Sequence, residues 1–207
     1  MRLATAVLVI VLGVASSASG QDADAEAPEW SFSASTYIYF LQDEANYAQP
    51  TVMADRGWLH LEARYNYEDH DTGSLWAGYN FSGGEKVTWE LAPLLGGVFG
   101  NTTGLAPAYK GSLSWRKLEF ASEGEYVFDV NDSSNNFFYN WSELALAPAE
   151  WWRIGMVTQR THVYATERDI QRGVLVGFTF KAVDSVAYVL NPDDSKPIVV
   201  LALSVGF

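Results

Sequence analysis

The chain has 207 residues and a formal net charge of −12, with 25 acidic and 13 basic side chains. This acidic balance, without a basic stripe, argues against a nucleic-acid partner, because phosphates are bound by lysine and arginine. Cysteine is absent, so no disulfide framework stabilises the fold. Aromatic residues are abundant (8 Trp, 11 Tyr, 11 Phe), yet the mean hydropathy is only −0.04. This combination suits a chain whose elements each have one apolar and one polar face.

The first segment, residues 1–20, has the pattern of a secretory signal peptide. Arg2 supplies a short positive region and residues 3–14 are almost wholly apolar. Ala18 and Gly20 are the small residues that signal peptidase requires before a cut at residue 21. The apolar run is too short to cross a bilayer of about 30 Å. We therefore predict export and cleavage, followed by an acidic segment at residues 21–29.

From residue 30 to residue 207 the apolar residues recur at every second position, which predicts β-strands rather than helices. We interpret this region as one all-β domain, a transmembrane antiparallel β-barrel of twelve strands. Ten strands are the alternative, because Pro50 weakens the second strand. The predicted strands are 30–41, 46–54, 58–67, 73–82, 85–95, 106–120, 124–131, 136–147, 150–161, 170–182, 185–190 and 197–207.

The predicted connections alternate between longer and shorter, as outer loops and periplasmic turns do in outer-membrane barrels. The uncharged, glycine-rich stretch Gly96–Leu105 is the longest and is the candidate plug or constriction. Short turns are expected at Asp55–Gly57, Ala121–Glu123 and Val183–Asp184, among others. The apolar phase flips near Arg116, which predicts a bulge inside the strand 106–120.

A soluble exported β-sandwich or lipocalin-like barrel would show the same alternation, with its apolar face inward. Aromatic residues near the predicted strand ends favour the membrane barrel, because they suit the two membrane interfaces. These residues are Trp30, Phe40, Trp58, Tyr67, Phe81, Phe120, Trp151, Trp152 and Phe207.

The last strand carries the most specific pattern, a terminal phenylalanine preceded by apolar residues at alternate positions. It resembles the C-terminal signature of bacterial outer-membrane proteins, although Val205 stands where that family prefers an aromatic residue. The resemblance implies an outer-membrane location among lipids and recognition by the barrel-assembly machinery. The residues concerned are Val199, Leu201, Leu203, Val205 and Phe207.

The predicted outer loops are acidic, which keeps them hydrated. Glu68, Asp69 and Asp71 are the densest acidic group, and divalent-cation binding there is the second interpretation, since carboxylates are hard oxygen ligands.

Strand alternation also predicts which side chains face the lumen, where charges avoid the lipid. With at least three cations and five carboxylates near balance, an interior salt-bridge network is expected. The lumen-lining candidates are His60, Glu62, Arg64, Asn66, Trp76, Glu90, Arg116, Tyr139, Trp141, Glu143, Arg153 and Gln159, with Asn80, Thr88, Glu125 and Asp129 on the same face.

Three functions remain open. A narrow passive channel for small solutes leads, because twelve strands leave more room than side chains alone fill. A closed structural or interaction barrel with a salt-bridged lumen follows. A lipid-modifying enzyme using His60 and Glu62 ranks third, because no nucleophile can be placed beside them. No cofactor is predicted, and the mixed lumen does not identify a solute.

Overall fold

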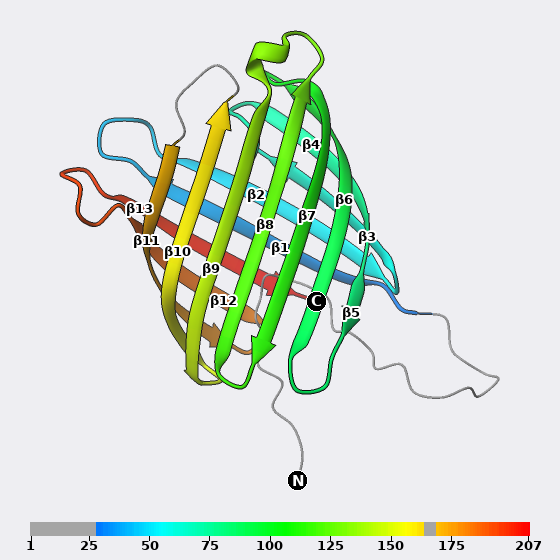
Figure 1. Ribbon diagram of the computed structural model, residues 1–207, viewed down its shortest axis with the longest axis vertical. Helices are drawn as coiled ribbons and strands as arrows, with labels where there is room; N and C mark the ends of the chain where they lie inside the picture. Colours follow the sequence, from blue (N-terminus) through cyan, green and yellow to red (C-terminus); the bar gives the residue numbers. More distant parts are fainter. Residues whose placement is uncertain (1–27, 164–168) are drawn as a thin grey trace.

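The computed structural model describes residues 28–163 and 169–207; the predicted signal peptide lies outside them, as does most of the acidic segment. The strands form one antiparallel sheet that closes on itself (Figure 1). Neighbours along the chain pair with one another, β1 pairs with β13, and the pairing of β4 with β6 completes the circle. The structure is therefore a closed antiparallel barrel, as predicted.

The strand bounds come in two groups. The first half of the barrel comprises β1 (Ser31–Phe40), β2 (Tyr47–Arg56), β3 (Leu59–Tyr65), β4 (Thr72–Tyr79), β5 (Phe81–Gly83), β6 (Thr88–Gly100) and β7 (Gly104–Trp115). The second half comprises β8 (Leu118–Asp129), β9 (Phe137–Ala149), β10 (Trp152–Val163), β11 (Asp169–Phe180), β12 (Val183–Leu190) and β13 (Ile198–Gly206).

Two of these segments, β4 and β5, are one strand interrupted at a single residue. Both pair with β6, through Gly78 with Leu94 and through Phe81 with Leu91. Between them Asn80 leaves the ladder, and its backbone N–H donates to the carbonyl of Trp58 at 2.7 Å. The thirteen segments thus make twelve strands, which confirms the predicted number.

The only helical element among the described residues is a short 3-10 turn, Ser133–Asn135, in the β8–β9 connection. No helix in the described ranges is long and apolar enough to cross a membrane. The two-residue turns, the start of β1 and Phe207 lie at one end of the barrel, which we call the turn end (Figure 1). The longer connections lie at the other, which we call the loop end.

Strand alternation separates an inner from an outer face. In β13, Val199 and Leu203 are exposed on the outside, whereas Val200 between them is completely buried in the interior. The same rule holds in β10, where Ile154 and Met156 are exposed and Val157 is buried. The outer face is therefore largely apolar and the polar side chains gather inside, as a membrane barrel requires.

One region of the outer face departs from this rule. On β7, β8 and β9, register places Gly111, Ser122 and Ser142 in one row and Tyr109, Gly124 and Asn140 in the next. These polar groups bond to one another: Asn140 Nδ2 donates to Tyr109 Oη at 2.9 Å and to Ser122 Oγ at 3.2 Å, and the two serine hydroxyls lie 2.9 Å apart. Mutual hydrogen bonding lowers the cost of polar groups on an apolar face.

The predicted ten-residue loop Gly96–Leu105 is wrong. Strands β6 and β7 pair as far as Val98 with Gly104, and only residues 101–103 connect them. Gly96 is a strand residue on the inner face, where a Cβ would lie 2.4 Å from the ring of Trp76. The lack of a side chain at Gly96 leaves room for the Trp76 indole. Most of the segment 96–105 is therefore part of the barrel wall and does not form a plug.

The predicted bulge near Arg116 is also wrong. Arg116, with φ +58°, and Lys117 form the turn between β7 and β8, so the phase of the apolar residues flips because the chain reverses. Arg116 is exposed at the turn end, against the ring of Trp115, and does not face the lumen. The predicted turns at Ala121–Glu123 and Val183–Asp184 are strand in the structure.

Candidate functional site

The interior is the candidate site, and one side of it is a charged wall formed by β2, β3, β7 and β8. We use this name for Asp55, His60, Glu62, Arg64, Lys110, Glu123 and Glu125. Glu62 is its centre. It accepts hydrogen bonds from Arg64 Nε and from Lys110 Nζ, each at 2.7 Å, and the pair with Lys110 joins β3 to β7.

Arg64 of β3 links the β2–β3 part of the charged wall to its β7–β8 part across the lumen. Its Nη1 donates to Glu125 Oε2 on β8 at 2.8 Å and lies 3.6 Å from Glu68 Oε1. Its guanidinium also lies over the rings of Tyr67 and Trp76, at 4.4 Å and 4.3 Å from their centroids. One cation is thus held by three carboxylates and two aromatic faces, which fixes its position.

His60 lies nearest the turn end of the charged wall and is completely buried. Its Nδ1 is 2.7 Å from Asp55 Oδ1 and its Nε2 is 3.2 Å from Glu62 Oε2. Asp55 Oδ1 also accepts a hydrogen bond from Asn80 Nδ2 at 2.7 Å. Two carboxylate partners suit an imidazolium that donates from both nitrogens. Because both ring nitrogens are engaged within the interior, this geometry gives no support to a lipid-cleaving base.

A second buried ion pair lies near the turn end, on strands β10 and β12, away from the charged wall. Arg153 on β10 donates from Nη1 and Nη2 to the two oxygens of Asp184 on β12, at 3.1 Å and 2.9 Å. Thr179 Oγ1 adds a bond to Asp184 at 2.6 Å, and Gly177 lets the Arg153 side chain pass close to the backbone. This two-point geometry is the strongest arrangement for a guanidinium and a carboxylate.

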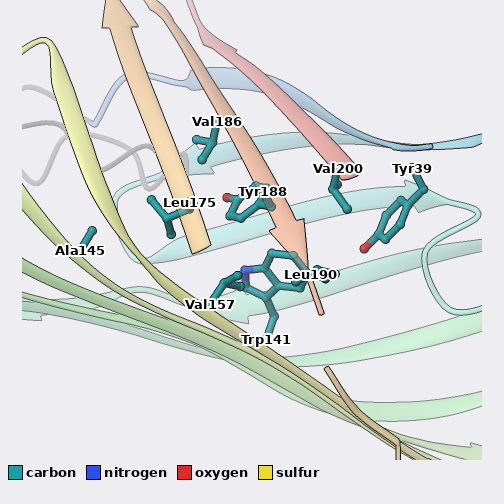
Figure 2. Packing of buried hydrophobic residues seen from close by; sticks show 9 residues of the cluster. All are labelled: Tyr39, Trp141, Ala145, Val157, Leu175, Val186, Tyr188, Leu190 and Val200. Atoms are coloured by element: carbon teal, nitrogen blue, oxygen red, sulfur yellow. The ribbon is translucent and has the colours of Figure 1, made fainter. Parts of the chain in front are cut away.

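The other side of the interior is an aromatic wall, formed by β1 and β9–β13. We use this name for Tyr39, Trp141, Ala145, Val157, Leu175, Val186, Tyr188, Leu190 and Val200 (Figure 2). The rings of Trp141 and Tyr188 meet edge to face at 5.1 Å, and both donate to the buried carboxylate of Glu143 at 2.7 Å.

Contacts between aromatic side chains from different strands narrow the lumen below the loop end. Tyr37 of β1 reaches Trp141 of β9 with ring centroids 5.7 Å apart, and Tyr67 reaches Tyr139 at 5.6 Å. An open cavity at the loop end, the loop-end vestibule, has a volume of about 530 Å³. A second, more enclosed inner cavity of only about 40 Å³ lies beyond these contacts, and Tyr67 borders both.

Most of the predicted lumen residues lie where alternation places them. The structure buries His60, Glu62, Arg64, Trp76, Trp141, Glu143 and Arg153 in the interior and leaves Glu90, Tyr139 and Gln159 half-buried on the same face. Asn66 lies instead in the β3–β4 connection with φ +57°, where it borders the vestibule, and Arg116 is in a turn.

Sequence reasoning missed five charged residues that the structure places inside the barrel. The pattern assigns Asp55, Glu123 and Asp184 to turns, whereas the structure places all three in strands. Lys110 and Glu119 lie on strands whose alternation places them inward, so a strict continuation of the pattern would have found Lys110. The missed residues are Asp55, Lys110, Glu119, Glu123 and Asp184.

These additions shift the charge of the interior. Among the described residues, buried carboxylates outnumber buried permanent cations six to three. The carboxylates are Asp55, Glu62, Glu119, Glu125, Glu143 and Asp184, and the cations are Arg64, Lys110 and Arg153. The expected near balance is therefore replaced by a surplus of acid.

The acidic loop group Glu68, Asp69 and Asp71 does not converge. Glu68 turns inward and accepts from Ser74 Oγ at 2.6 Å, Asp69 accepts from Thr102 Oγ1 at 3.1 Å, and Asp71 accepts from Tyr65 at 3.2 Å. Burial raises the pKa of the Glu68 carboxyl, although Arg64 and Ser74 act against this shift. Within the described ranges, no three His, Cys, Asp or Glu side chains are placed to hold a metal ion.

No protein-family model matches the chain, and no curated protein matches it in sequence. Solved structures do. The KdgM porin is 11% identical, with a TM-score of 0.56 over 84% of this chain and 99% of that one. The KdgM porin in complex with disordered oligogalacturonate gives 0.55 at 11% identity, over 86% and 99%. The Acinetobacter baumannii outer membrane protein Omp33 gives 0.50 at 9% identity, over 88% and 100%.

The chain has the fold of an outer-membrane porin. This likeness confirms the predicted resemblance to small outer-membrane barrels and excludes the β-sandwich alternative. At such low identity it concerns the fold alone, so the function rests on the interior residues of this chain.

Proposed function

We propose that the chain is a narrow channel of the bacterial outer membrane that passes small solutes passively and favours cations over anions. The observation that carries this proposal is the acid surplus of the interior, six buried carboxylates against three permanent cations. Rings and rows of carboxylates favour cations in pores because they replace part of the hydration shell and repel anions.

The membrane location is supported by the outer face. Large apolar side chains are exposed around the barrel, among them Leu75, Leu95, Leu105 and Met156. In water such a surface would be an unusually large exposed apolar patch, whereas lipid covers it without cost. The solved barrels with the same fold are outer-membrane proteins, which agrees with this location.

The path through the barrel would begin in the loop-end vestibule. It would pass the aromatic contacts of Tyr67 with Tyr139 and of Tyr37 with Trp141, and would reach the inner cavity between Glu62 and Arg153. These side chains can change rotamer without moving the barrel wall. The constriction would therefore set the size of the solute, and the carboxylates on either side would set its charge.

A closed structural barrel is the second candidate, and a specific observation favours it. The bonds from Arg64 to Glu125 and from Lys110 to Glu62 join strands that are not neighbours in the sheet, so ion pairs bridge part of the lumen. If these bridges persist in lipid, they would stabilise the barrel without leaving a path.

Conductance in planar lipid bilayers decides between the two candidates. We expect discrete current steps and, under a KCl gradient, a reversal potential with the sign of potassium permeation. The variant Glu143→Gln should lower this selectivity, whereas Glu150→Gln, in an exposed turn, should leave it unchanged. A barrel that folds by heat-modifiable gel migration but never conducts would favour the closed structure, and anion selectivity would exclude the proposed preference.

A further inference from the structure

The loop-end vestibule is lined by aromatic rings and oxygen acceptors. The rings are those of Tyr47, Tyr67, Phe137 and Tyr139, and the carboxylates are those of Glu68, Asp69 and Asp129. No lysine or arginine is among the described residues that line it. Its volume of about 530 Å³ is sufficient for a small-molecule ligand, for which sites of about 300–1,000 Å³ are typical.

Between the loop-end vestibule and the inner cavity, the buried carboxyl groups outnumber the cations that face them. Arg64 and Lys110 together face four carboxylates, at N···O distances from 2.7 Å to 4.0 Å. Carboxyl groups therefore outnumber arginine and lysine side chains by two at this level. The four carboxylates are Glu62, Glu68, Glu123 and Glu125.

Three buried acceptor atoms at this level have no hydrogen-bond partner among the described residues: Glu68 Oε2, Glu125 Oε1 and Gln159 Oε1. The side chains of Glu68 and Glu125 are 0% and 3% exposed, so both are held inside rather than extended into solvent. A buried acceptor without a donor is costly, because it has lost water and gained nothing in return. These atoms are therefore prepared for a ligand that brings donors.

We propose that the loop-end vestibule binds a small organic cation carrying N–H donors, an ammonium or guanidinium compound. This deepens the proposed channel function by naming the solute class at its entrance. The N–H groups would satisfy the free oxygens, the charge would offset the acid surplus, and the tyrosine faces suit a cation held against them. An acidic sugar would add to the negative charge, and a neutral sugar would leave it uncompensated.

Isothermal titration of the folded barrel in detergent micelles tests the proposal without requiring transport. Agmatine, which has a guanidinium and an ammonium group, is the probe. We expect it to bind with an affinity at least about tenfold higher than 1,4-bis(trimethylammonio)butane, because the latter has both positive charges but no N–H donor. Galacturonate and glucose should show no binding under the same conditions.

Two variants locate the site and one controls for charge. Glu68→Gln should weaken agmatine binding about tenfold or more, and Gln159→Leu by a smaller factor, since it removes a neutral acceptor. Asp194→Asn changes the same charge in an exposed connection at the loop end, outside the vestibule, and should leave the affinity unchanged. Heat-modifiable gel migration establishes that each variant is folded, and Gln159→Leu serves if Glu68→Gln is not.

The outcomes separate this inference from the proposed channel. Agmatine binding that both variants weaken supports the site even if the barrel never conducts, in which case only the channel proposal fails. Conductance with cation selectivity but no agmatine binding overturns the site alone. Equal affinity for agmatine and galacturonate, or agmatine binding unaffected by both variants, also overturns it.

Discussion

The two walls of the lumen are built from strands of the same kind but are stabilised differently. On the charged wall, buried side chains are held by directed bonds, such as those from Arg64 and Lys110 to Glu62. On the aromatic wall, Trp141 and Tyr188 are held by ring packing and by two hydrogen bonds to one carboxylate. Directed bonds make each member depend on its partner, whereas packing distributes the loss over several neighbours. Substitutions on the two walls should therefore differ in their consequences.

The largest effect is expected at the centre of the charged wall. Glu62→Gln removes the charge that faces Arg64, Lys110 and His60, and replaces one of its two acceptor oxygens with an NH2 donor that faces other donors. Breaking a buried ion pair by removing one partner costs about 3–5 kcal/mol. Urea unfolding in lipid vesicles, followed by tryptophan fluorescence, measures the loss.

Glu119→Gln is the matched control for this variant. Glu119 is an equally buried glutamate, but its Oε2 has no partner in the described part of the chain and it forms no ion pair there. We expect its loss to change the free energy of unfolding little. Equal destabilisation by the two variants would show that burial of the carboxylate, rather than its network, decides the cost.

The aromatic wall gives the next effect. Trp141→Ala removes the ring that contacts both Tyr37 and Tyr188, and should cost about 3 kcal/mol, in the range of large-to-small core substitutions. Because the ring also narrows the lumen, the single-channel conductance should rise. Trp115→Ala, at an exposed position at the turn end, controls for the loss of an indole. A less stable barrel with unchanged conductance would show that Trp141 packs the wall without limiting the pore.

The sequence indicated the charged wall better than the aromatic one, and the reason is geometric. His60, Glu62 and Arg64 alternate with Leu59, Leu61 and Ala63, so the phase of one strand sufficed to place them. The aromatic wall joins six strands, and Val200 or Leu175 has no polar character that would mark it as lumenal. Without knowing which residues of a strand point inward, one assigns an apolar residue of a barrel strand to the lipid-facing side.

Two of the misplaced residues, Asp55 and Asp184, lie where strands end. Asp55 and Asp184 are of the type that favours turns, so the pattern assigned them to turns. In the structure both strands include these residues, and alternation then points the carboxylates inward to His60 and Arg153. Turn position depends on pairing with the neighbouring strand, a non-local property that the local pattern does not contain.

A smaller effect is expected for the ion pair between Arg153 of β10 and Asp184 of β12 near the turn end. Arg153→Lys keeps the charge but loses the planar two-point contact with Asp184, so we expect a loss of about 1–2 kcal/mol. Arg172→Lys alters an exposed pair with Asp193 and should have no measurable effect on unfolding. If both variants unfold alike, the buried geometry would contribute nothing beyond charge.

The smallest effect concerns the outer face, where polar residues on β7, β8 and β9 lie among apolar ones. Asn140→Ala removes the amide that donates to Tyr109 and Ser122, so their hydroxyls would face lipid with fewer partners. We expect a loss of about 1 kcal/mol in lipid, the net value of an ordinary hydrogen bond. Asn131→Ala, in an exposed connection, is the control. If Asn140→Ala were instead stabilising, the amide would cost more in the apolar face than its hydrogen bonds return, and its place among lipid-facing residues would need another cause.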